Sequence, residues 1–341
     1  MAKEDEPYRI SATQLFEDNK NREIVTLCLS ADIALGGGIP RGCTVLIAGK
    51  PKSGKTTLCL QFAANAQKKY KCKVFIFPIE GRMSSLVLNQ IQGLDKDNVE
   101  IVNPPAIFDK DGKVLGFKKL PSEKWFELIG NCIQEHPGCV IIVDSLANMS
   151  SEKEQSEDMG FQDRGGRNKL EAEFCRKYGN LIIPNRCIVF LITQIQANTS
   201  GFGAPMIAKV GNQMKHQADV MLICKNTEKW PEQNGRILGH DAVYIVEASA
   251  LGPPLLEMKA PLRYGYGIDN VQDTMNHAIT WQQILKAGAW YRIPFDKDGI
   301  QTTIEENMVK LQGEANVRDW LFNHPEQTNI LEKTIREKIL G

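Results

Sequence analysis

Residues 43–62 contain amino acids whose types and spacing suit phosphate binding. An apolar β-branched run over residues 44–48 stops at Gly49, a short loop follows, and Gly54-Lys55-Thr56-Thr57 opens a helix-forming run. This order predicts a strand, an anion-binding loop and a helix, which is the setting of a P-loop. Glycines at 49 and 54 let backbone N–H groups and the positive end of the helix face a phosphate chain. A glycine turn before an ordinary helix is the alternative.

The predicted loop has one residue for the phosphates and one for a metal ion. Lys55 reaches the β- and γ-phosphates in a P-loop, and the Thr56 hydroxyl holds Mg²⁺. The sequence therefore predicts ATP and Mg²⁺ as cofactors. The predicted nucleotide-binding residues of the loop are Gly49, Lys50, Pro51, Lys52, Ser53, Gly54, Lys55, Thr56 and Thr57.

Two further apolar runs each end in an acid. Residues 73–80 read as a strand ending in Glu80, and residues 140–144 as a strand ending in Asp144. Functional side chains gather at the carboxyl ends of parallel strands, beside the nucleotide loop. Glu80 is a candidate base that orients water on the γ-phosphate, and Asp144 fits the Walker B acid that binds Mg²⁺. For Glu80, a solvated acid at a strand end is the alternative.

Two loops lie further along the chain. Residues 149–167 are polar and glycine-punctuated, with acids packed into 152–158 and arginines at Arg164 and Arg167. Residues 195–214 have no acid, three glycines, one aromatic residue (Phe202) and Lys209. Flexible backbone, N–H donors and a ring suit a groove for single-stranded nucleic acid. An ordinary surface loop is the alternative for the second of these segments.

Composition limits the class of protein. The 341 residues include 41 Lys and Arg and 41 Asp and Glu, so the formal net charge is zero and any nucleic-acid contact needs a local patch. Nine cysteines with no Cys-x-x-Cys pair predict buried thiols in a reducing compartment. No apolar run reaches membrane-spanning length and the first residues are polar. We therefore expect a cytoplasmic protein without membrane contact.

The order of the segments predicts an α/β fold with a mostly parallel central sheet flanked by helices. Residues 29–269 form the expected core, which residues 219–224 and 242–246 extend with antiparallel strands. Residues 270–341 change to helix, hairpin and helices, and so predict a small α+β domain. Shorter features are a helix over 8–19, a helix over 123–135, a helix over 168–178, a strand over 187–193, and an exposed loop or small hairpin over 103–122.

At this point the chain resembles the RecA-type strand-exchange recombinases, in the branch of bacterial RecA and phage UvsX-like proteins, from about residue 24 onward. The resemblance rests on segments in family order: residues 32–36, 49–57, 79–80, 143–145, 193–195, 211–215, 264–268 and 286–291. The last of them, Lys-Ala-Gly-Ala-Trp-Tyr, is far more specific than a P-loop, because it separates RecA from KaiC-like and DnaB-like ATPases.

The resemblance implies a RecA-like P-loop core and an ATP-dependent recombinase. Such a protein forms filaments on single-stranded DNA and pairs that strand with homologous duplex, with a single-stranded DNA-binding protein and a loader as further partners. Residues 1–28 are then expected to form an oligomerisation segment.

The resemblance also implies roles for single residues. The implied catalytic residues are Lys55, Glu80, which matches the family's catalytic glutamate, and Gln194, which matches its γ-phosphate sensor. Tyr264 matches a residue near the adenine. Segments 149–167 and 195–210 match the two DNA loops, with Phe202 as an inserted wedge, and Lys169, Arg176, Gly211 and Asn212 match residues that hold the DNA backbone.

Several features of the sequence depart from the family pattern, and they leave the packing of neighbouring subunits open. The N-terminal helix is shorter, residues 103–122 look inserted, and no acidic tail closes the chain. Glu247 and Ser249 stand where bacterial relatives carry two lysines that reach the neighbour's γ-phosphate; Lys215 is the first candidate replacement, and Lys259 or Arg263 the second. The alternative functions are a nucleotide-gated, non-catalytic single-stranded-DNA-binding mediator, which Glu80 disfavours, and a hexameric helicase motor, which residues 286–291 disfavour.

Overall fold

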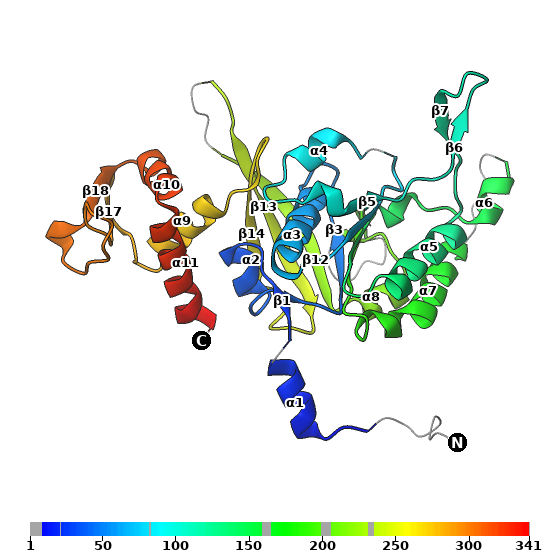
Figure 1. The fold of residues 1–341 in the computed structure, drawn as a ribbon, viewed down its shortest axis with the longest axis horizontal. Helices are drawn as coiled ribbons and strands as arrows, with labels where there is room; N and C mark the ends of the chain where they lie inside the picture. Colours follow the sequence, from blue (N-terminus) through cyan, green and yellow to red (C-terminus); the bar gives the residue numbers. More distant parts are fainter. Residues whose placement is uncertain are drawn as a thin grey trace.

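A nine-stranded sheet forms the centre of the molecule in the computed structural model (Figure 1). The structure describes residues 9–20, 22–81, 83–158, 165–198, 206–230 and 235–340. In sheet order the strands are β15 (Gly267–Ile268), β14 (Glu257–Arg263), β13 (Gly239–Ser249), β12 (Val220–Lys229), β3 (Cys43–Ala48), β9 (Ile188–Thr193), β8 (Val140–Asp144), β4 (Val74–Phe77) and β5 (Val99–Ile101).

The sheet has a parallel part and an antiparallel part. From β12 through β3, β9, β8 and β4 to β5 every pairing is parallel. Strands β3 and β9 are buried along their whole length, which is why they read as unbroken apolar runs. On the other side, β12, β13, β14 and β15 pair antiparallel. The expected α/β class and its antiparallel extension are confirmed.

Helices cover both faces of this sheet. Val45 and Ile47 of β3 pack into the cluster that contains α3 (Lys55–Tyr70), whereas Leu46 and Ala48 pack with α5 (Ser122–Glu135) and α7 (Gly166–Ile182). Successive side chains of a strand point to opposite faces, so this alternation fixes which helix covers which face. The order helix, sheet, helix is the three-layer arrangement of α/β proteins.

The carboxyl ends of the parallel strands meet at one edge of the sheet. There β3 runs into the P-loop, β9 into Gln194, β8 into residues 145–151, and β4 into the turn that carries Glu80. Strand β5 runs into a hairpin of β6 (Ala106–Phe108) and β7 (Val114–Phe117), which confirms the small hairpin expected in 103–122. This edge positions most of the candidate site residues.

Residues 270–340 form a separate group of elements, at the left of Figure 1. They are α9 (Asn270–Thr280), β16 (Leu285–Ala287), β17 (Trp290–Ile293), β18 (Val309–Gln312), α10 (Glu314–Asn323) and α11 (Pro325–Leu340). Their side chains form a hydrophobic cluster that also takes in Leu29 of α2 (Leu29–Ala34). The ion pair of Arg336 with buried Asp32, 2.8 Å long, also joins α11 to α2. The domain boundaries at 28 and 269 stay a prediction.

Smaller elements complete the fold. They are α1 (Ala12–Lys20), the paired strands β1 (Ile24–Val25) and β2 (Ile39–Pro40), α4 (Ser85–Asn89), α6 (Glu152–Ser156), the paired strands β10 (Ile195–Ala197) and β11 (Met206–Ala208), and α8 (Asn212–Gln217). No helix in the described ranges is long and apolar enough to cross a membrane. Eight of the nine cysteines are buried thiols and Cys132 is half-buried.

Two expected elements differ from the structure. The strand expected to run to Glu80 ends at Phe77, because Pro78 has no N–H for the ladder and accepts a turn hydrogen bond from Gly81 instead. The segment expected as a loop from 149 contains α6. Its Ser151 hydroxyl caps the helix by accepting the N–H of Glu154, and Ser-x-x-Glu is a helix-start pattern.

Candidate functional site

The P-loop curls tightly between β3 and α3, and its two glycines are needed for different reasons. A Cβ at Gly49 would lie 2.7 Å from Cβ of Cys224 and 2.8 Å from Oγ of Ser53. Gly54 has a φ of 83°, a left-handed conformation that side chains disfavour, and a Cβ there would collide with Leu262. Strand β12, which contains Cys224, and strand β14, which contains Leu262, thus pack against the P-loop.

Lys55 is buried at the start of α3. Its Nζ donates hydrogen bonds to the carbonyl of Gly49 over 3.1 Å and to that of Lys50 over 2.7 Å. Burial lowers the pKa of Lys55, while the nearby carboxylates of Asp144 and Glu80 oppose this shift. The lysine therefore brings a cation close to the two acids Asp144 and Glu80.

Thr56 and Asp144 meet across the end of the sheet. The Thr56 hydroxyl donates a 2.6 Å hydrogen bond to Oδ2 of Asp144. Burial raises the pKa of Asp144, the hydrogen bond from Thr56 lowers it, and the nearby charge of Glu80 raises it. Two oxygens held this way suit Mg²⁺, which binds through one or two protein oxygens with phosphates and water completing its shell.

Glu80 lies beside this pair. Its Oε1 accepts a 2.9 Å hydrogen bond from the Ser145 hydroxyl, and its backbone N–H donates to the carbonyl of Asp144 over 3.2 Å. The carboxylate is half-buried and therefore reachable by solvent. Strand β8 thus positions both acids, one on its own last residue and one through the serine that follows.

These residues line one cavity of about 650 Å³. Its walls include the predicted residues Pro51, Lys52, Ser53, Gly54, Lys55, Thr56, Thr57, Glu80, Asp144, Gln194 and Tyr264. The structure therefore brings together the predicted nucleotide, metal and catalytic residues, except that Gly49 and Lys50 do not line the cavity and contact Lys55 through their carbonyls. Within the described residues, the buried Ser53 Oγ has no hydrogen-bond partner. Such an orphaned polar atom in the loop fits a ligand that bears oxygen atoms, as a nucleotide phosphate does.

Sequence reasoning did not place three polar residues of this cavity, Ser145, Asn148 and His240, and it considered Arg263 only as a cation for a neighbouring subunit. His240 lies against Tyr264, with Nδ1 3.2 Å from the tyrosine hydroxyl and ring centroids 5.5 Å apart. Burial lowers the pKa of His240, against the raising effect of Asp241. The pairing of β13 with β14 sets His240 opposite Leu262, a register that no local pattern reveals.

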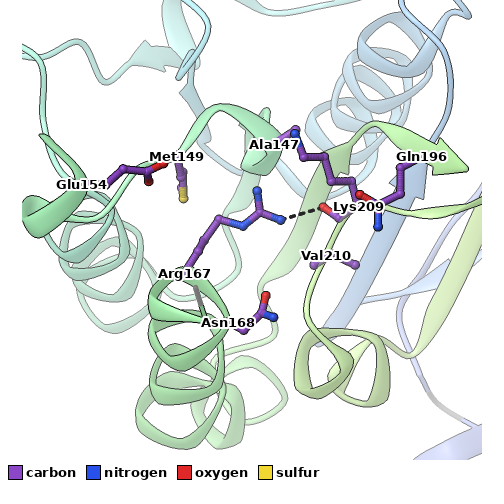
Figure 2. A pocket seen from close by; sticks show the side chains of 9 residues that line it. Ala147, Met149, Glu154, Arg167, Asn168, Gln196, Lys209 and Val210 are labelled. Carbon is purple, nitrogen blue, oxygen red and sulfur yellow. Dashed lines mark hydrogen bonds between the residues drawn. The ribbon is translucent and has the colours of Figure 1, made fainter. Parts of the chain in front are cut away.

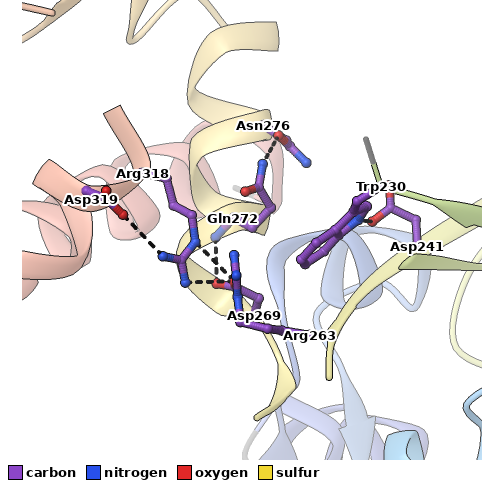
Figure 3. Close-up of polar contacts among 8 residues, drawn as sticks. All are labelled: Trp230, Asp241, Arg263, Asp269, Gln272, Asn276, Arg318 and Asp319. Atoms are coloured by element: carbon purple, nitrogen blue, oxygen red, sulfur yellow. Dashed lines mark hydrogen bonds and ion pairs between the residues drawn. The ribbon is translucent and has the colours of Figure 1, made fainter. Parts of the chain in front are cut away.

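Arg263 links the cavity to the C-terminal elements (Figure 3). Its Nε donates to Oδ2 of Asp269 over 2.5 Å, and Nη2 of Arg318 from α10 binds the same oxygen over 2.9 Å. The other oxygen of Asp269 caps α9 by accepting the N–H of Gln272. Arg263 also stacks on the ring of Trp230 at 5.0 Å. One buried carboxylate therefore holds a cavity arginine and α10 together.

A second cavity of about 390 Å³ lies between the two predicted DNA loops (Figure 2). Arg167 and Lys209, both predicted, line it together, and Nη2 of Arg167 donates to the carbonyl of Lys209 over 3.0 Å. Asn168 and Gln196 also line it and were missed, although amide side chains in such loops are a signal for polar ligands. Arg164 and Phe202 lie outside the described residues.

A buried acid holds Arg167, one of the residues that line this cavity. Glu171 of α7 accepts the N–H of Gly211 over 2.6 Å and forms an ion pair with Nε of Arg167 at 3.1 Å. Burial raises the pKa of Glu171, while the Gly211 N–H and Arg167 lower it. Arg167 is thus held by internal contacts, and Gly211 is fixed at the start of α8, where Asn212 is exposed.

Comparison with known proteins identifies the family of this chain. The family model of the RecA N-terminal domain matches residues 11–269. The chain belongs to the RecA family. The RecA proteins of Geobacter metallireducens, Mannheimia haemolytica and Dichelobacter nodosus are each 29% identical to it. These matches cover 92%, 93% and 93% of this chain and 84%, 79% and 83% of the relatives.

Two predicted DNA contacts of this RecA-family chain lie apart from the second cavity. Lys169 and Arg176 are exposed on α7 and do not line it. Their separation of seven positions corresponds to about 10 Å along the helix. Arg176 therefore lies further from the loops than its assignment suggests, and both residues stay predictions as DNA contacts.

The three candidates for a cation that reaches a neighbouring subunit differ in their surroundings. Arg263 lines the cavity of its own chain and is bound by Asp269. Lys259 is exposed and forms an ion pair with Glu228 at 3.1 Å. Lys215 of α8 is half-buried, and its charge lowers the pKa of Glu247, which burial raises. The geometry therefore favours Lys215 over the other two for a contact outside its own chain.

Proposed function

We propose that this RecA-family protein is an ATP-dependent recombinase that forms filaments on single-stranded DNA and pairs the bound strand with homologous duplex. One observation carries the proposal: the end of β9 joins the two cavities. Gln194 lines the first cavity, and its carbonyl accepts the N–H of Lys209, which lines the second, over 2.8 Å. A ligand in one cavity can therefore act on the other through a single strand end.

The first cavity supports binding of ATP. Lys55 and the N–H groups at the start of α3 bind the phosphates, because the helix end and the ammonium group both favour negative charge. Thr56 and Asp144 hold Mg²⁺, which neutralises charge on the phosphate oxygens when bound. Tyr264 and His240 lie at the side of the cavity and offer rings to the adenine.

Hydrolysis depends on Glu80. Its carboxylate orients a water molecule toward the γ-phosphate and accepts the water proton, and the Ser145 hydroxyl keeps the carboxylate in place. The retained acid and its serine favour an ATPase over a mediator that only binds nucleotide. The expected enzyme is therefore a DNA-dependent ATPase.

The coupling between nucleotide and DNA is a switch with Gln194 as its relay. The side-chain amide binds the γ-phosphate, and the β9 end and Lys209 move with it, so that the second DNA loop gains affinity for DNA in the ATP state. Hydrolysis removes this contact and lowers the affinity. The proposed partners are single-stranded DNA, homologous duplex, other copies of the chain in a helical filament, and a single-stranded DNA-binding protein with a loader.

A D-loop assay tests the proposal. Wild-type protein, single-stranded DNA and a homologous supercoiled duplex are incubated with ATP, with a non-hydrolysable analogue and with ADP. We expect joint molecules with ATP and with the analogue and none with ADP. Lys55→Ala should abolish them, whereas Lys71→Ala, an exposed lysine after the far end of α3, should not. DNA binding without any joint molecules would contradict the recombinase and leave a binding mediator.

A further inference from the structure

The hairpin of β6 and β7 is an ordered element at the end of the sheet. We call residues 103–120 the edge hairpin. Ala106 pairs with Phe117 and Ile107 with Gly116, and the N–H of Lys118 closes the base by donating to the carbonyl of Pro105. In Figure 1 the strands project well beyond the body of the molecule. The edge hairpin therefore presents both of its faces to its surroundings.

Large apolar side chains of the edge hairpin are exposed to water. The exposed fractions are 44% for Ile107, 59% for Phe108, 48% for Val114, 66% for Leu115 and 53% for Phe117. An isolated two-stranded hairpin lacks a second layer in which to bury such residues. A cluster of this kind marks a surface that binds another molecule.

The charge of the edge hairpin is positive. It carries four lysines, Lys110, Lys113, Lys118 and Lys119, against two acids, Asp109 and Asp111. Asp109 is engaged in the turn, where its carboxylate accepts the N–H groups of Asp111 and Lys113. Across the described part of the chain, none of the four lysines forms an ion pair, whereas the nearby Lys73 and Lys124 do.

The position of the edge hairpin continues the row of loops at the carboxyl edge. Strands β9, β8, β4 and β5 are successive neighbours, so the second DNA loop, the first DNA loop, the Glu80 turn and the edge hairpin follow one another. Hydrogen bonds join the hairpin base to the first loop: Gln155 donates to the carbonyl of Leu120, and the N–H of Ser122 to that of Ser150. Helix α6 of the first DNA loop bears acids, so it does not suit contacts with phosphates. Cations for phosphate contacts at this end of the row of loops therefore have to come from another element.

We propose that the edge hairpin is a third DNA-contacting element, which binds a single DNA strand. Its lysines contact phosphates, and Phe108 and Leu115 contact base faces. This combination of exposed apolar side chains and unpaired cations suits a single strand, because the flat faces of its bases stack on apolar side chains and its backbone is anionic. The inference rests on the proposed function, since the DNA strand must first bind to the two DNA loops. These loops contact each other through Arg167 and Lys209.

Two variants with matched controls test this. In Lys113→Ala/Lys118→Ala we expect the slope of log affinity against log salt to become shallower by about 0.7 for each phosphate that a lysine no longer neutralises. In Phe108→Ala/Leu115→Ala we expect the Kd to rise at least about fivefold, the effect of removing one side chain that stacks on a base. The controls are Lys68→Ala/Lys71→Ala near the far end of α3, and Ile300→Ala/Ile304→Ala, which are exposed in the C-terminal region.

The measurement is fluorescence anisotropy with a labelled oligo-dT strand, full-length protein and a non-hydrolysable ATP analogue, from 50 to 300 mM salt. Effects in both hairpin variants and neither control support the proposal. Unchanged Kd and salt dependence in both hairpin variants overturn it, while nucleotide-dependent binding by the wild type leaves the recombinase standing. Failure of the wild type to bind with nucleotide refutes the proposed function itself. A change in light scattering without DNA, at unchanged DNA affinity, would assign the hairpin to protein contacts and also overturn the inference.

Discussion

The Ser145 hydroxyl donates a 2.9 Å hydrogen bond to Oε1 of Glu80. Ser145 follows the last residue of β8, and Glu80 lies in the turn after the neighbouring strand β4. The bond orients the carboxylate toward the cavity that also contains Lys55 and Thr56. Two acids on adjacent strand ends, Glu80 and Asp144, can thus have different roles because their partners differ.

Glu80→Gln should retain nucleotide binding and lose turnover. The amide keeps the size of the side chain and can still contact Ser145, but it cannot accept a proton from water, so we expect kcat to fall by a factor on the order of 100 or more. Steady-state ATPase assays with single-stranded DNA and titration with a fluorescent ATP analogue measure the two effects. Glu100→Gln, an exposed acid on β5, is the control. Near-normal turnover would show that Glu80 is only a solvated acid at a strand end.

Gln194→Ala should uncouple DNA affinity from the nucleotide. Its side chain lines the nucleotide cavity while its backbone holds Lys209, so truncation removes the relay and leaves the strand end intact. We expect the DNA affinities measured with the ATP analogue and with ADP to become equal and DNA-stimulated ATPase to disappear. Gln196→Ala, two residues further along β10, is a control for the coupling because Gln196 lines only the DNA-loop cavity. A wild type that binds DNA equally well with both nucleotides would refute the switch.

The sequence predicted the parts of this site that are local. The P-loop, Glu80 and Asp144 each belong to a short strand-end pattern, and parallel pairing then brings them together without further information. Arg263 and His240 could not be found in this way, because the antiparallel register of β13 and β14 brings them to the cavity. Glu171 was missed because an acid in the middle of a polar helix reads as solvated, whereas the packing of α8 on α7 buries it.

Asp269→Asn should destabilise the protein and weaken its hold on nucleotide. The substitution removes the charge that compensates Arg263 and Arg318 at a side chain with 1% exposure. Breaking such a buried pair costs about 3–5 kcal/mol, so we expect a lower thermal unfolding midpoint and a raised KM for ATP. Asp319→Asn, whose side chain is 70% exposed beside the same Arg318, should change stability by less than about 0.5 kcal/mol. An unchanged midpoint in Asp269→Asn would show that the two arginines find other partners.

Asp32→Asn should flatten the pH dependence of stability. Burial raises the pKa of Asp32 to about 7, against the lowering effect of Arg336. The folded state then binds a proton that the unfolded state has released, so this group's contribution is complete below about pH 4 and is lost as pH rises through about 7. We expect the wild-type thermal midpoint to fall more between pH 5.5 and 8 than that of the variant. Identical pH profiles would mean that Arg336 keeps Asp32 ionised throughout.

Lys215 should act on the nucleotide of a neighbouring subunit. No lysine or arginine occurs between residues 241 and 257, the stretch in which the resemblance to bacterial RecA proteins leads us to expect two interface lysines. A cation at that place stabilises charge on the transferring phosphoryl group. We therefore expect weak DNA-stimulated ATPase in the wild type and a further large loss in Lys215→Ala. Lys259→Ala should have less effect, because Glu228 binds that lysine.

Mixed filaments distinguish action between subunits from a local structural effect. Subunits carrying Lys215→Ala retain Glu80, and subunits carrying Glu80→Gln retain Lys215, so mixing the two inactive proteins should restore activity at interfaces that combine both intact residues. Because the charge of Lys215 also acts on Glu247, Lys215→Ala/Glu247→Gln is the second test. If Lys215 only compensates the charge of Glu247, ATPase activity should recover in the double variant and not in the mixed filaments. If Lys215 acts on the nucleotide of the neighbour, the double variant should stay inactive. A fast ATPase that is indifferent to substitution of Lys215, Lys259 and Arg263 would contradict this view of the interface.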